Sequence, residues 1–272
     1  MKPFQPRGAF VLVTGASAGI GKATAIALEK AGARLALAAR DMDRLNALRA
    51  TFQLPGEHVP VRLDVTDPKS VDAAYKEIEG RFGKLDGIVA NAGVGGWFSV
   101  HETPEDEMRR IFETNVYGVI RCIRGAVPLL KKAGGGTIVI VSSVVGRRGV
   151  PGMGIYSASK FALHGLADSA RIELRPDNID VSVICPALTK TEFHPRGTGE
   201  KGAAPGPNEG ESSEAVAAGI VSLLQSGKPE AHRFGALNPK RWAGIVTQIA
   251  PRFMDKQLES YYAARKAAAE KR

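Results

Sequence analysis

Cysteine and long apolar runs are both scarce in this sequence of 272 residues. The only two cysteines, Cys122 and Cys185, are too few for a disulfide scaffold, and their spacing offers no metal cluster. No apolar run approaches the ~18 residues that a membrane span requires. The residues before Ala9 also lack the apolar core of a signal peptide. We therefore expect a protein of the reducing cytoplasm without a metal site.

Charge is distributed unevenly along the chain. The 37 Lys and Arg residues outnumber the 28 Asp and Glu residues, which gives a formal net charge of +9. From His232 onward nine basic and three acidic residues contribute +6, so the residues before His232 carry only +3. A main body this close to neutrality lacks the basic surface that nucleic-acid binding requires, and we expect no such partner. With 44% hydrophobic and 24% charged residues, the composition excludes disordered and collagen-like architectures.

Short apolar segments alternate with longer amphipathic ones. Runs of four to six apolar residues suit strands that are buried on both faces of a parallel sheet. Asp67-Pro68 and Thr103-Pro104 each place a capping side chain before a proline at the first helical position. The alternation predicts an α/β fold with a doubly wound, Rossmann-type parallel sheet. The predicted strands are 9–13, 34–39, 59–63, 87–90, 137–141 and 180–184, and the predicted helices are 20–31, 42–52, 68–81, 104–131, 156–175 and 213–226.

The pattern predicts a single domain over residues 8–235 and a basic helical C-terminal extension over 236–272. Residues 194–210 interrupt the alternation, because they hold five glycines and three prolines. We interpret them as the centre of a flexible substrate loop, 192–212. A lid over the site and a plain connection both remain open.

A glycine-rich turn follows the first predicted strand directly and leads into a helix. It reads Thr14-Gly15-Ala16-Ser17-Ala18-Gly19-Ile20-Gly21. Glycines let backbone N–H groups approach a pyrophosphate, and a helix N-terminus favours its negative charge. We therefore predict a dinucleotide at this turn, with a purely structural turn as the alternative.

The end of the second predicted strand bears on the choice of dinucleotide. Ala39 stands where such folds usually present an acidic residue to the adenosine ribose, and Arg40 follows it. An arginine can pair with a 2′-phosphate, so the sequence predicts NADP(H) in preference to NAD(H). The alternative is that Arg40 is a solvated residue at the start of a helix.

Ser143, Tyr156 and Lys160 form the strongest chemical pattern. The i,i+4 spacing places Tyr156 and Lys160 on one face of a helix. A nearby ammonium favours a phenolate, so we expect Lys160 to lower the pKa of Tyr156. Ser143 follows the neighbouring strand and can donate a hydrogen bond to a carbonyl or alkoxide oxygen. Together they supply an acid/base, a charge that tunes it and an oxyanion partner, as hydride transfer requires.

With these residues, the sequence resembles the short-chain dehydrogenase/reductase family over about residues 8–235. The match is to the shorter branch, which has a TGxxxGxG turn and a YxxxK helix. The resemblance implies that Tyr156 protonates the carbonyl oxygen, that Ser143 steadies it and that Lys160 also binds the ribose. Asn115 would hold a water molecule in a proton relay. The implied cofactor contacts are Gly15, Ser17, Ala18, Gly19, Ile20, Gly21, Arg40, Asp64, Val65, Asn91, Ala92, Gly93, Tyr156, Lys160, Pro186, Thr189 and Thr191.

The segments around the nicotinamide would line the substrate pocket. Their apolar character favours a hydrophobic ketone, aldehyde or secondary alcohol, and hence an NADP-dependent carbonyl reductase or alcohol dehydrogenase. One alternative is a non-catalytic sensor or scaffold on the same fold. Another is epimerase or dehydratase chemistry, although that longer family branch has a TGxxGxxG turn and an extra domain. The predicted lining residues are Val94, Gly95, Trp97, Val145, Met153, Leu188 and Phe193.

Three further interpretations concern contacts rather than chemistry. In the family, helices corresponding to 104–131 and 156–175 pair across a two-fold axis, so the resemblance implies a homodimer or homotetramer. His164, two turns beyond Tyr156, is interpreted as a packing or interface residue. The apolar stripe of the 236–272 extension would cover the cleft or a neighbouring subunit. The alternative is weak contact of its basic flanks with an anionic membrane surface.

Overall fold

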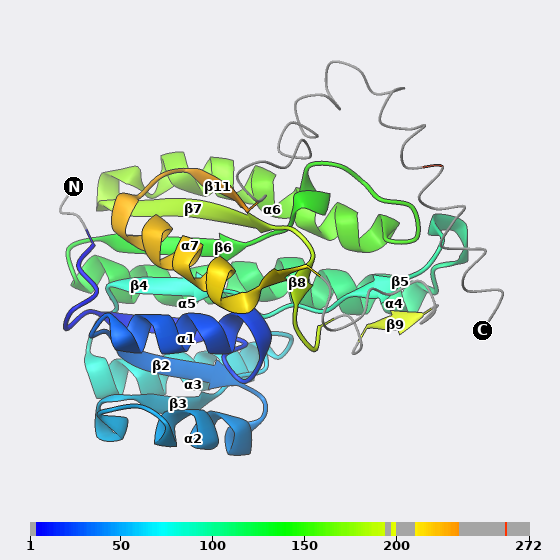
Figure 1. Ribbon diagram of the computed structural model, residues 1–272. Coiled ribbons are helices and arrows are strands. Elements are labelled where there is room, and N and C mark those ends of the chain that lie inside the picture. The colour runs from blue at the N-terminus through cyan, green and yellow to red at the C-terminus, as the bar shows by residue number, and fades with distance from the viewer. Residues whose placement is uncertain (1–3, 194–196, 200–209, 234–258, 260–272) are drawn as a thin grey trace.

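The computed structural model describes residues 4–193, 197–199, 210–233 and 259. Seven parallel strands form one central sheet in the order β11-β7-β6-β4-β1-β2-β3 (Figure 1). This order places the carboxyl ends of β1, β4, β6 and β7 side by side. The strands are β1 (Phe10–Thr14), β2 (Arg34–Ala39), β3 (Val59–Arg62), β4 (Gly87–Ala90), β6 (Gly136–Val141), β7 (Ile179–Pro186) and β11 (Glu230–Arg233).

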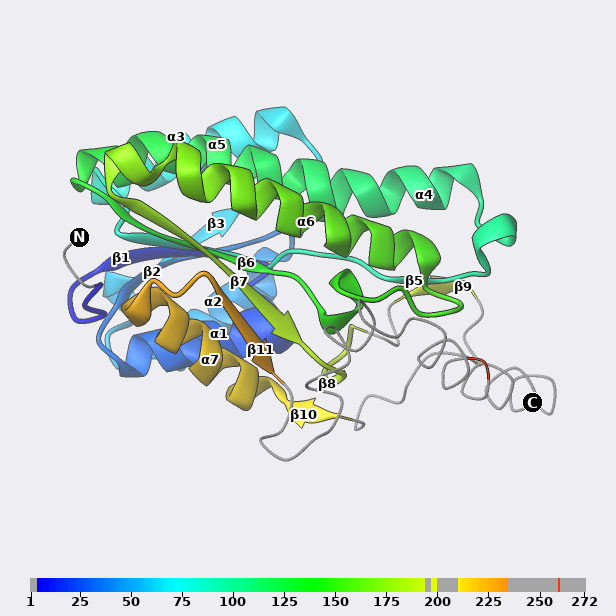
Figure 2. The ribbon, with the colours of Figure 1, turned by 90° about the horizontal axis from the view of Figure 1, so that it is seen from above.

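Helices cover both faces of the sheet. The first layer consists of α1, α2 and α7, and the second of α3, α5 and α6 (Figure 2). The expected doubly wound α/β fold is therefore confirmed. The helices are α1 (Gly19–Lys30), α2 (Met42–Ala50), α3 (Pro68–Phe82), α5 (Gly118–Lys132), α6 (Gly154–Glu173) and α7 (Ser213–Ser226).

Alternate residues of each central strand enter two different cores. In β6, Ile138 and Ile140 pack beneath α3 and α5, whereas Val139 and Val141 pack beneath α1 and α7. This two-sided burial explains why the strands appear in the sequence as continuous apolar runs. Each fully buried aliphatic side chain contributes about 1.5–3 kcal/mol.

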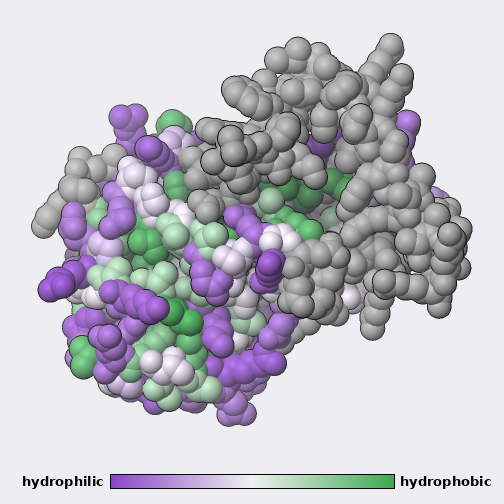
Figure 3. All heavy atoms as spheres, viewed as in Figure 1, coloured by the Kyte–Doolittle hydropathy of each residue, from purple (hydrophilic) through white to green (hydrophobic). Residues whose placement is uncertain are grey.

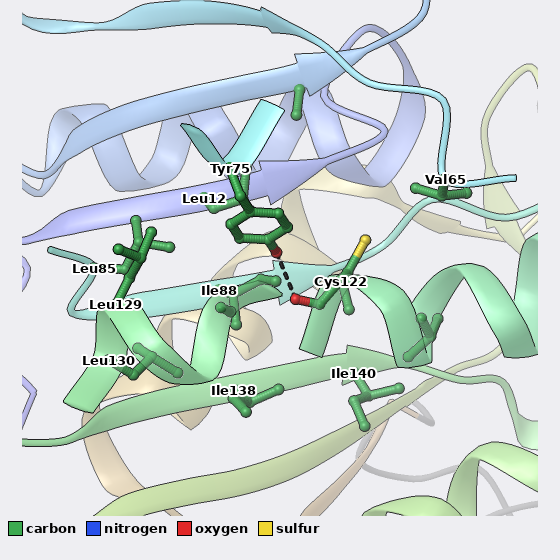
Figure 4. Close-up of a cluster of buried hydrophobic side chains, with 14 of the residues drawn as sticks. Leu12, Val65, Tyr75, Leu85, Ile88, Cys122, Leu129, Leu130, Ile138 and Ile140 are labelled. Atoms are coloured by element: carbon green, nitrogen blue, oxygen red, sulfur yellow. Dashed lines mark hydrogen bonds between the residues drawn. The ribbon is translucent and has the colours of Figure 1, made fainter. Parts of the chain in front are cut away.

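The core beneath α3 and α5 includes one polar contact (Figure 4). The Tyr75 hydroxyl donates to the Cys122 carbonyl oxygen at 2.5 Å, which satisfies the buried hydroxyl. Burial raises the pKa of the Cys122 thiol to about 12. Cys122 is therefore a protonated core thiol at neutral pH, as its apolar surroundings suggest.

One of the two capping side chains that the sequence predicts acts as expected, since Asp67 accepts a hydrogen bond from Lys69 N at 3.0 Å. At the start of α7, Ser212 also accepts a hydrogen bond, from Ala215 N at 3.1 Å. The prediction for Thr103 is wrong, because its hydroxyl donates to the Ser99 carbonyl oxygen instead. Helix α4 (Glu105–Phe112) starts one residue later than expected, with Pro104 at its N-cap.

The helix predicted over 104–131 is present from Glu105 to Lys132, but it is not α-helical throughout. One π-helical turn, Glu113–Tyr117, separates α4 from α5. Such a turn is a short bulge inside a longer helix, and a search for the α-helical period over the whole segment does not specify where it lies. The turn contains Asn115, whose side chain is fully buried.

The seventh strand, β11, is absent from the sequence prediction. It pairs with β7 at the edge of the sheet, and an edge strand does not need the apolar run of a central one. In the loop predicted as flexible, β9 (Thr198–Gly199) pairs with β5 (Gly96–Trp97), and β10 (Glu211–Ser212) pairs with β8 (Thr189–Lys190). The predicted 236–272 extension, apart from Glu259, lies outside the described residues. In the described part of the chain, no helix is long and apolar enough to cross a membrane.

Candidate active site

The glycine-rich turn joins β1 to α1 at the carboxyl edge of the sheet. Gly15 and Gly19 have φ angles of 67° and 52°, and a Cβ on Gly21 would lie 2.2 Å from the Gly15 carbonyl oxygen. Only glycine fits such a close approach. The N-cap, Ala18, makes no side-chain capping bond, and the first turn of α1 has no acidic residue. The helix therefore presents its N–H groups and positive end, which fits the diphosphate of a dinucleotide.

Thr14 connects this turn to the segment after β4. Its hydroxyl oxygen accepts hydrogen bonds from Asn91 N at 3.0 Å and Ala92 N at 3.1 Å. In return, Asn91 Nδ2 donates to the Thr14 carbonyl oxygen at 2.9 Å. Thr14 is not among the predicted site residues, although its position directly before Gly15 is a signal.

Arg40 and Asp64 lie where the adenosine end of the cofactor is expected. Burial raises the pKa of Asp64, but two hydrogen bonds from Thr66 and the nearby Arg40 guanidinium outweigh burial and hold that pKa below its usual value. Asp64 is therefore a carboxylate at neutral pH. Arg62, which the sequence reasoning missed, is exposed at the β3 position paired with Ala39. Arg40 and Arg62 thus add two cations beside a position that lacks an acid.

The π-helical turn brings Asn115 against the segment after β4. Asn115 Oδ1 accepts from Val94 N at 2.8 Å, and its Nδ2 donates to the Val94 carbonyl oxygen at 3.0 Å and to Ser159 Oγ at 3.0 Å. A Cβ on Gly93 would lie 3.3 Å from Asn115 Oδ1 and 3.7 Å from Lys160 Nζ. Asn115 therefore clamps this segment beside the buried lysine.

The three residues of the predicted catalytic pattern converge. The Tyr156 hydroxyl is hydrogen-bonded to the Ser143 side chain. Lys160 Nζ lies 5.7 Å from the centre of the Tyr156 ring and donates to the Val141 carbonyl oxygen at 2.9 Å. The strand end of β6 and one face of α6 thus hold a phenol, its neutral hydrogen-bond partner and a cation together, as acid/base chemistry would require.

The expected effect of Lys160 on Tyr156 is not what the structure shows. Burial raises the pKa of Tyr156 above its ordinary value, and the Ser143 hydrogen bond only partly opposes this. Burial also lowers the pKa of Lys160 to about 8, and the nearby Cys185 opposes this shift without cancelling it. Both shifts follow from the low dielectric around the pair, which disfavours each charged form. Tyr156 is therefore a neutral phenol at neutral pH, the form that donates a proton.

Apolar side chains from three separate segments surround Tyr156. Trp97 and Met153 form one buried cluster with Tyr156, and Val145 and Phe193 pack against it. The rings of Tyr156 and Phe193 are 5.8 Å apart between centroids. In the space-filling view, apolar residues appear beyond the carboxyl end of β7 (Figure 3).

The remaining predicted pocket residues are placed differently. A Cβ on Gly95 would lie 2.9 Å from the Phe193 ring, so Gly95 lies directly against Phe193. The Val94 backbone is hydrogen-bonded to the Asn115 side chain, and the Leu188 carbonyl oxygen accepts a hydrogen bond from Glu211 N. Neither Val94 nor Leu188 is part of the cluster around Tyr156.

The segment after β7 runs from the pocket to the glycine-rich turn. A Cβ on Gly19 would lie 3.1 Å from Thr191 Cγ2, and Thr191 Oγ1 accepts a hydrogen bond from Phe193 N at 3.2 Å. Ser143 Oγ lies 3.4 Å from the Pro186 carbonyl oxygen. Pro186 and Thr191 therefore lie between the turn and the catalytic residues, where the nicotinamide is expected.

A polar cluster that the sequence did not reveal holds the segment that carries Gly95 and Trp97. Arg110 on α4 donates to the Gly95 carbonyl oxygen at 2.9 Å and to Thr198 Oγ1 at 2.8 Å, and Glu107 accepts from Thr198 Oγ1 at 2.6 Å. Burial raises the pKa of Glu107, but hydrogen bonds from Arg110 and Thr198 together with the Arg110 charge keep it below its usual value. This cluster attaches β9 to the segment that carries Trp97.

Comparison with known proteins places this geometry in a family. The family model of short chain dehydrogenases matches residues 9–200. The 3beta-hydroxysteroid dehydrogenase of Mediterraneibacter gnavus is 36% identical over 192 residues, which are 70% of this chain and 69% of that protein. The chain spans only 15% of the length of another, much longer relative.

Solved structures agree with these matches. An alcohol dehydrogenase from Thermococcus sibiricus, complexed with 5-hydroxy-NADP, has 31% identity and a TM-score of 0.76, and the match covers 85% of this chain and 98% of that one. A 3-ketoacyl-(acyl-carrier-protein) reductase from Brucella melitensis, complexed with NADH, has 25% identity, the same TM-score of 0.76 and the same coverages of 85% and 98%. Both complexes hold a nicotinamide dinucleotide. The shared sheet and the matched sequence show that this chain belongs to the short-chain dehydrogenase/reductase family.

Proposed function

We propose that the protein transfers a hydride between NADP(H) and the carbonyl or secondary alcohol of an apolar ketone, aldehyde or alcohol. The observation that carries this proposal is the placement of Tyr156, which is hydrogen-bonded to Ser143 and packed in one buried cluster with Trp97 and Met153. A proton donor embedded in apolar side chains suits an apolar carbonyl better than a sugar. The alcohol and hydroxysteroid substrates implied by the names of two similar proteins are consistent with this class.

The residues present fit the dinucleotide at both ends. The glycine-rich turn and the uncapped start of α1 would hold the diphosphate. Arg40 would pair with the 2′-phosphate, and Lys160 would bind the nicotinamide ribose. When bound, the reduced nicotinamide supplies the hydride that reaches the carbonyl carbon.

The side chains of this chain would manage the proton and the charge. Ser143 would donate a hydrogen bond to the carbonyl oxygen, and Tyr156 would transfer its phenolic proton to that oxygen as it becomes an alcohol. The Lys160 ammonium would stabilise the phenolate that this transfer leaves behind. In alcohol oxidation the proton returns to Tyr156.

A direct assay tests this proposal. The full chain is incubated with NADPH and a panel of apolar ketones and aldehydes, and cofactor oxidation is followed by absorbance. We expect substrate-dependent oxidation, with polar sugars as the matched negative panel. Cofactor binding without turnover across a broad apolar panel would favour the non-catalytic sensor or scaffold instead.

The pKa of Lys160 leads to a pH prediction. Because burial lowers that pKa to about 8, the ammonium is present below this pH and lost above it. We expect kcat/KM for NADPH, which reports groups of the free enzyme, to fall as the pH rises through about 8. In Lys160→Arg the guanidinium stays charged, so whatever activity remains should not show this inflection. The same inflection in both proteins would rule out Lys160 as its origin.

We also propose that copies of this chain associate with one another. Tyr117, Phe161 and Ile172 are apolar side chains that are 52%, 44% and 70% exposed on the π-helical turn and α6. A homodimer or homotetramer that covers this face would bury them. We expect light scattering coupled to size exclusion to give a mass of at least two chains at micromolar concentration, and a monomer would contradict this.

A further inference from the structure

A buried hydrogen-bonded cluster of Ser142, His164 and Cys185 lies directly behind the catalytic residues. The three side chains are 3%, 5% and 0% exposed. His164 Nε2 is 3.1 Å from Ser142 Oγ and 3.8 Å from Cys185 Sγ. The interpretation of His164 as a packing or interface residue therefore omits its polar contacts.

Each member of the cluster is close in sequence to a residue of the candidate site. Ser142 directly precedes Ser143, Cys185 directly precedes Pro186, and His164 lies one helical turn after Lys160. The cluster thus joins the ends of β6 and β7 to α6. Ser143 follows β6, Pro186 ends β7, and α6 carries both Tyr156 and Lys160.

Hydrogen bonds to both ends of Lys160 make this junction rigid. Ser142 Oγ donates to the Lys160 carbonyl oxygen at 3.2 Å, while Lys160 Nζ donates to the Val141 carbonyl oxygen at 2.9 Å. A Cβ on Gly146 would lie 2.8 Å from Ser142 Oγ and 2.9 Å from the Lys160 carbonyl oxygen. The turn after Ser143 is therefore packed tightly against Ser142 Oγ and the Lys160 carbonyl oxygen, which leaves Ser142 little room to move.

The donor pattern assigns a proton to the imidazole. The single hydroxyl proton of Ser142 is used toward the Lys160 carbonyl oxygen, so its oxygen is the acceptor for His164. His164 must then carry hydrogen on Nε2, and Cys185 Sγ is a second, weaker acceptor at that nitrogen. From α6, the Nε2–H group therefore donates toward Ser142 Oγ after β6 and toward Cys185 Sγ near the end of β7.

We propose that His164 is a positioning residue, which holds Ser143 and Lys160 in register with Tyr156 through Ser142. This inference rests on the proposed function. Without the Nε2–H donor, Ser142 and the strand end that carries Ser143 can shift relative to α6. A shift of about 1 Å in a catalytic group can cost on the order of 100-fold in rate.

A double-mutant cycle between His164 and Ser142 tests the proposal. His164→Leu fills the space without a donor, His164→Gln restores an N–H donor, and Ser142→Ala removes the acceptor. We expect His164→Leu to lower kcat for ketone reduction by about 10- to 100-fold, with the KM for NADPH changed much less, because the glycine-rich turn that would hold the diphosphate is unaltered. His164→Gln should recover most of kcat. In the Ser142→Ala background, His164→Leu should cost no more than about twofold, because the two residues act through one contact.

His58 provides a matched control, since it is the other buried histidine that the structure describes. Its Nδ1 accepts a hydrogen bond from Leu35 N at 3.2 Å, between β2 and β3 and away from the catalytic residues. His58→Leu should lower the melting temperature and leave kcat unchanged, which separates loss of stability from loss of positioning.

The inference would be overturned by a wild-type kcat in His164→Leu, by no recovery in His164→Gln, or by independent effects of the two sites. Ser142→Ala keeps the ring in place, so an unchanged kcat in this variant also overturns it, whether or not His164→Leu folds. A wild-type protein with no activity on any carbonyl would instead contradict the proposed function.

Discussion

Replacement of Tyr156 with phenylalanine is expected to lower ketone reduction by about 10²- to 10⁴-fold, the range that general acid catalysis contributes. Phenylalanine keeps the ring that packs against Trp97, Met153 and Phe193, but has no proton to transfer. Because the hydroxyl makes its hydrogen bond with Ser143 rather than with the core, folding should survive the change.

The measurement is kcat with saturating NADPH, together with the dissociation constant of NADPH from fluorescence. A normal dissociation constant with a reduced kcat assigns the loss to the chemical step. Tyr75→Phe is the control, because it also removes a buried tyrosine hydroxyl, at a hydrogen bond to the Cys122 carbonyl oxygen in the core. We expect Tyr75→Phe to affect stability alone. More than a tenth of wild-type activity in Tyr156→Phe would refute Tyr156 as the acid.

The double change Ala39→Asp with Arg40→Ala is expected to move cofactor preference from NADPH toward NADH by at least about 100-fold. Loss of the guanidinium removes charge-assisted hydrogen bonds worth about 1.5–3 kcal/mol, or about 10- to 100-fold. The new carboxylate adds a ribose acceptor and repels the 2′-phosphate. Ala39 is buried at the end of β2, next to exposed Arg40, so the aspartate would start at the edge where its carboxylate can reach solvent.

The ratio of kcat/KM values for NADPH and NADH measures this switch, with the single variants measured alongside. Arg62→Ala is an informative companion, because Arg62 lies opposite Ala39 on β3. We expect Arg62→Ala to weaken NADPH binding less than Arg40→Ala. An unchanged ratio in the double variant would exclude Arg40 as the group that reads the 2′-phosphate.

The central strands and the catalytic pattern could be predicted because each rests on local sequence. Residues such as Val139 and Ile140 face opposite cores and are both apolar, so the strand is visible in the composition. Tyr156 and Lys160 are one helical turn apart, which is a relation that spacing alone specifies.

The features that could not be predicted depend on distant parts of the chain. His164 contacts Ser142 and Cys185, which are 22 and 21 residues away in sequence and belong to two different strands. The direction of the Tyr156 pKa shift follows from burial, which only the packed structure specifies. Arg110 and Thr198 are 88 residues apart, and no periodicity relates them.

The order of the strands has a consequence for how the protein is made. Pairing of β1 with β2 and β4, and of β2 with β3, involves only residues before Asn91, so the half of the sheet that contains the glycine-rich turn can form while later residues are still being synthesised. The half that carries Ser143 and Tyr156 is added afterwards, and β11 pairs with β7 last. Until β11 emerges, β7 presents an open edge of Val183, Ile184 and Cys185 to other chains. A chain stopped before Glu230 would therefore keep its nucleotide-binding half but remain exposed to aggregation at that edge.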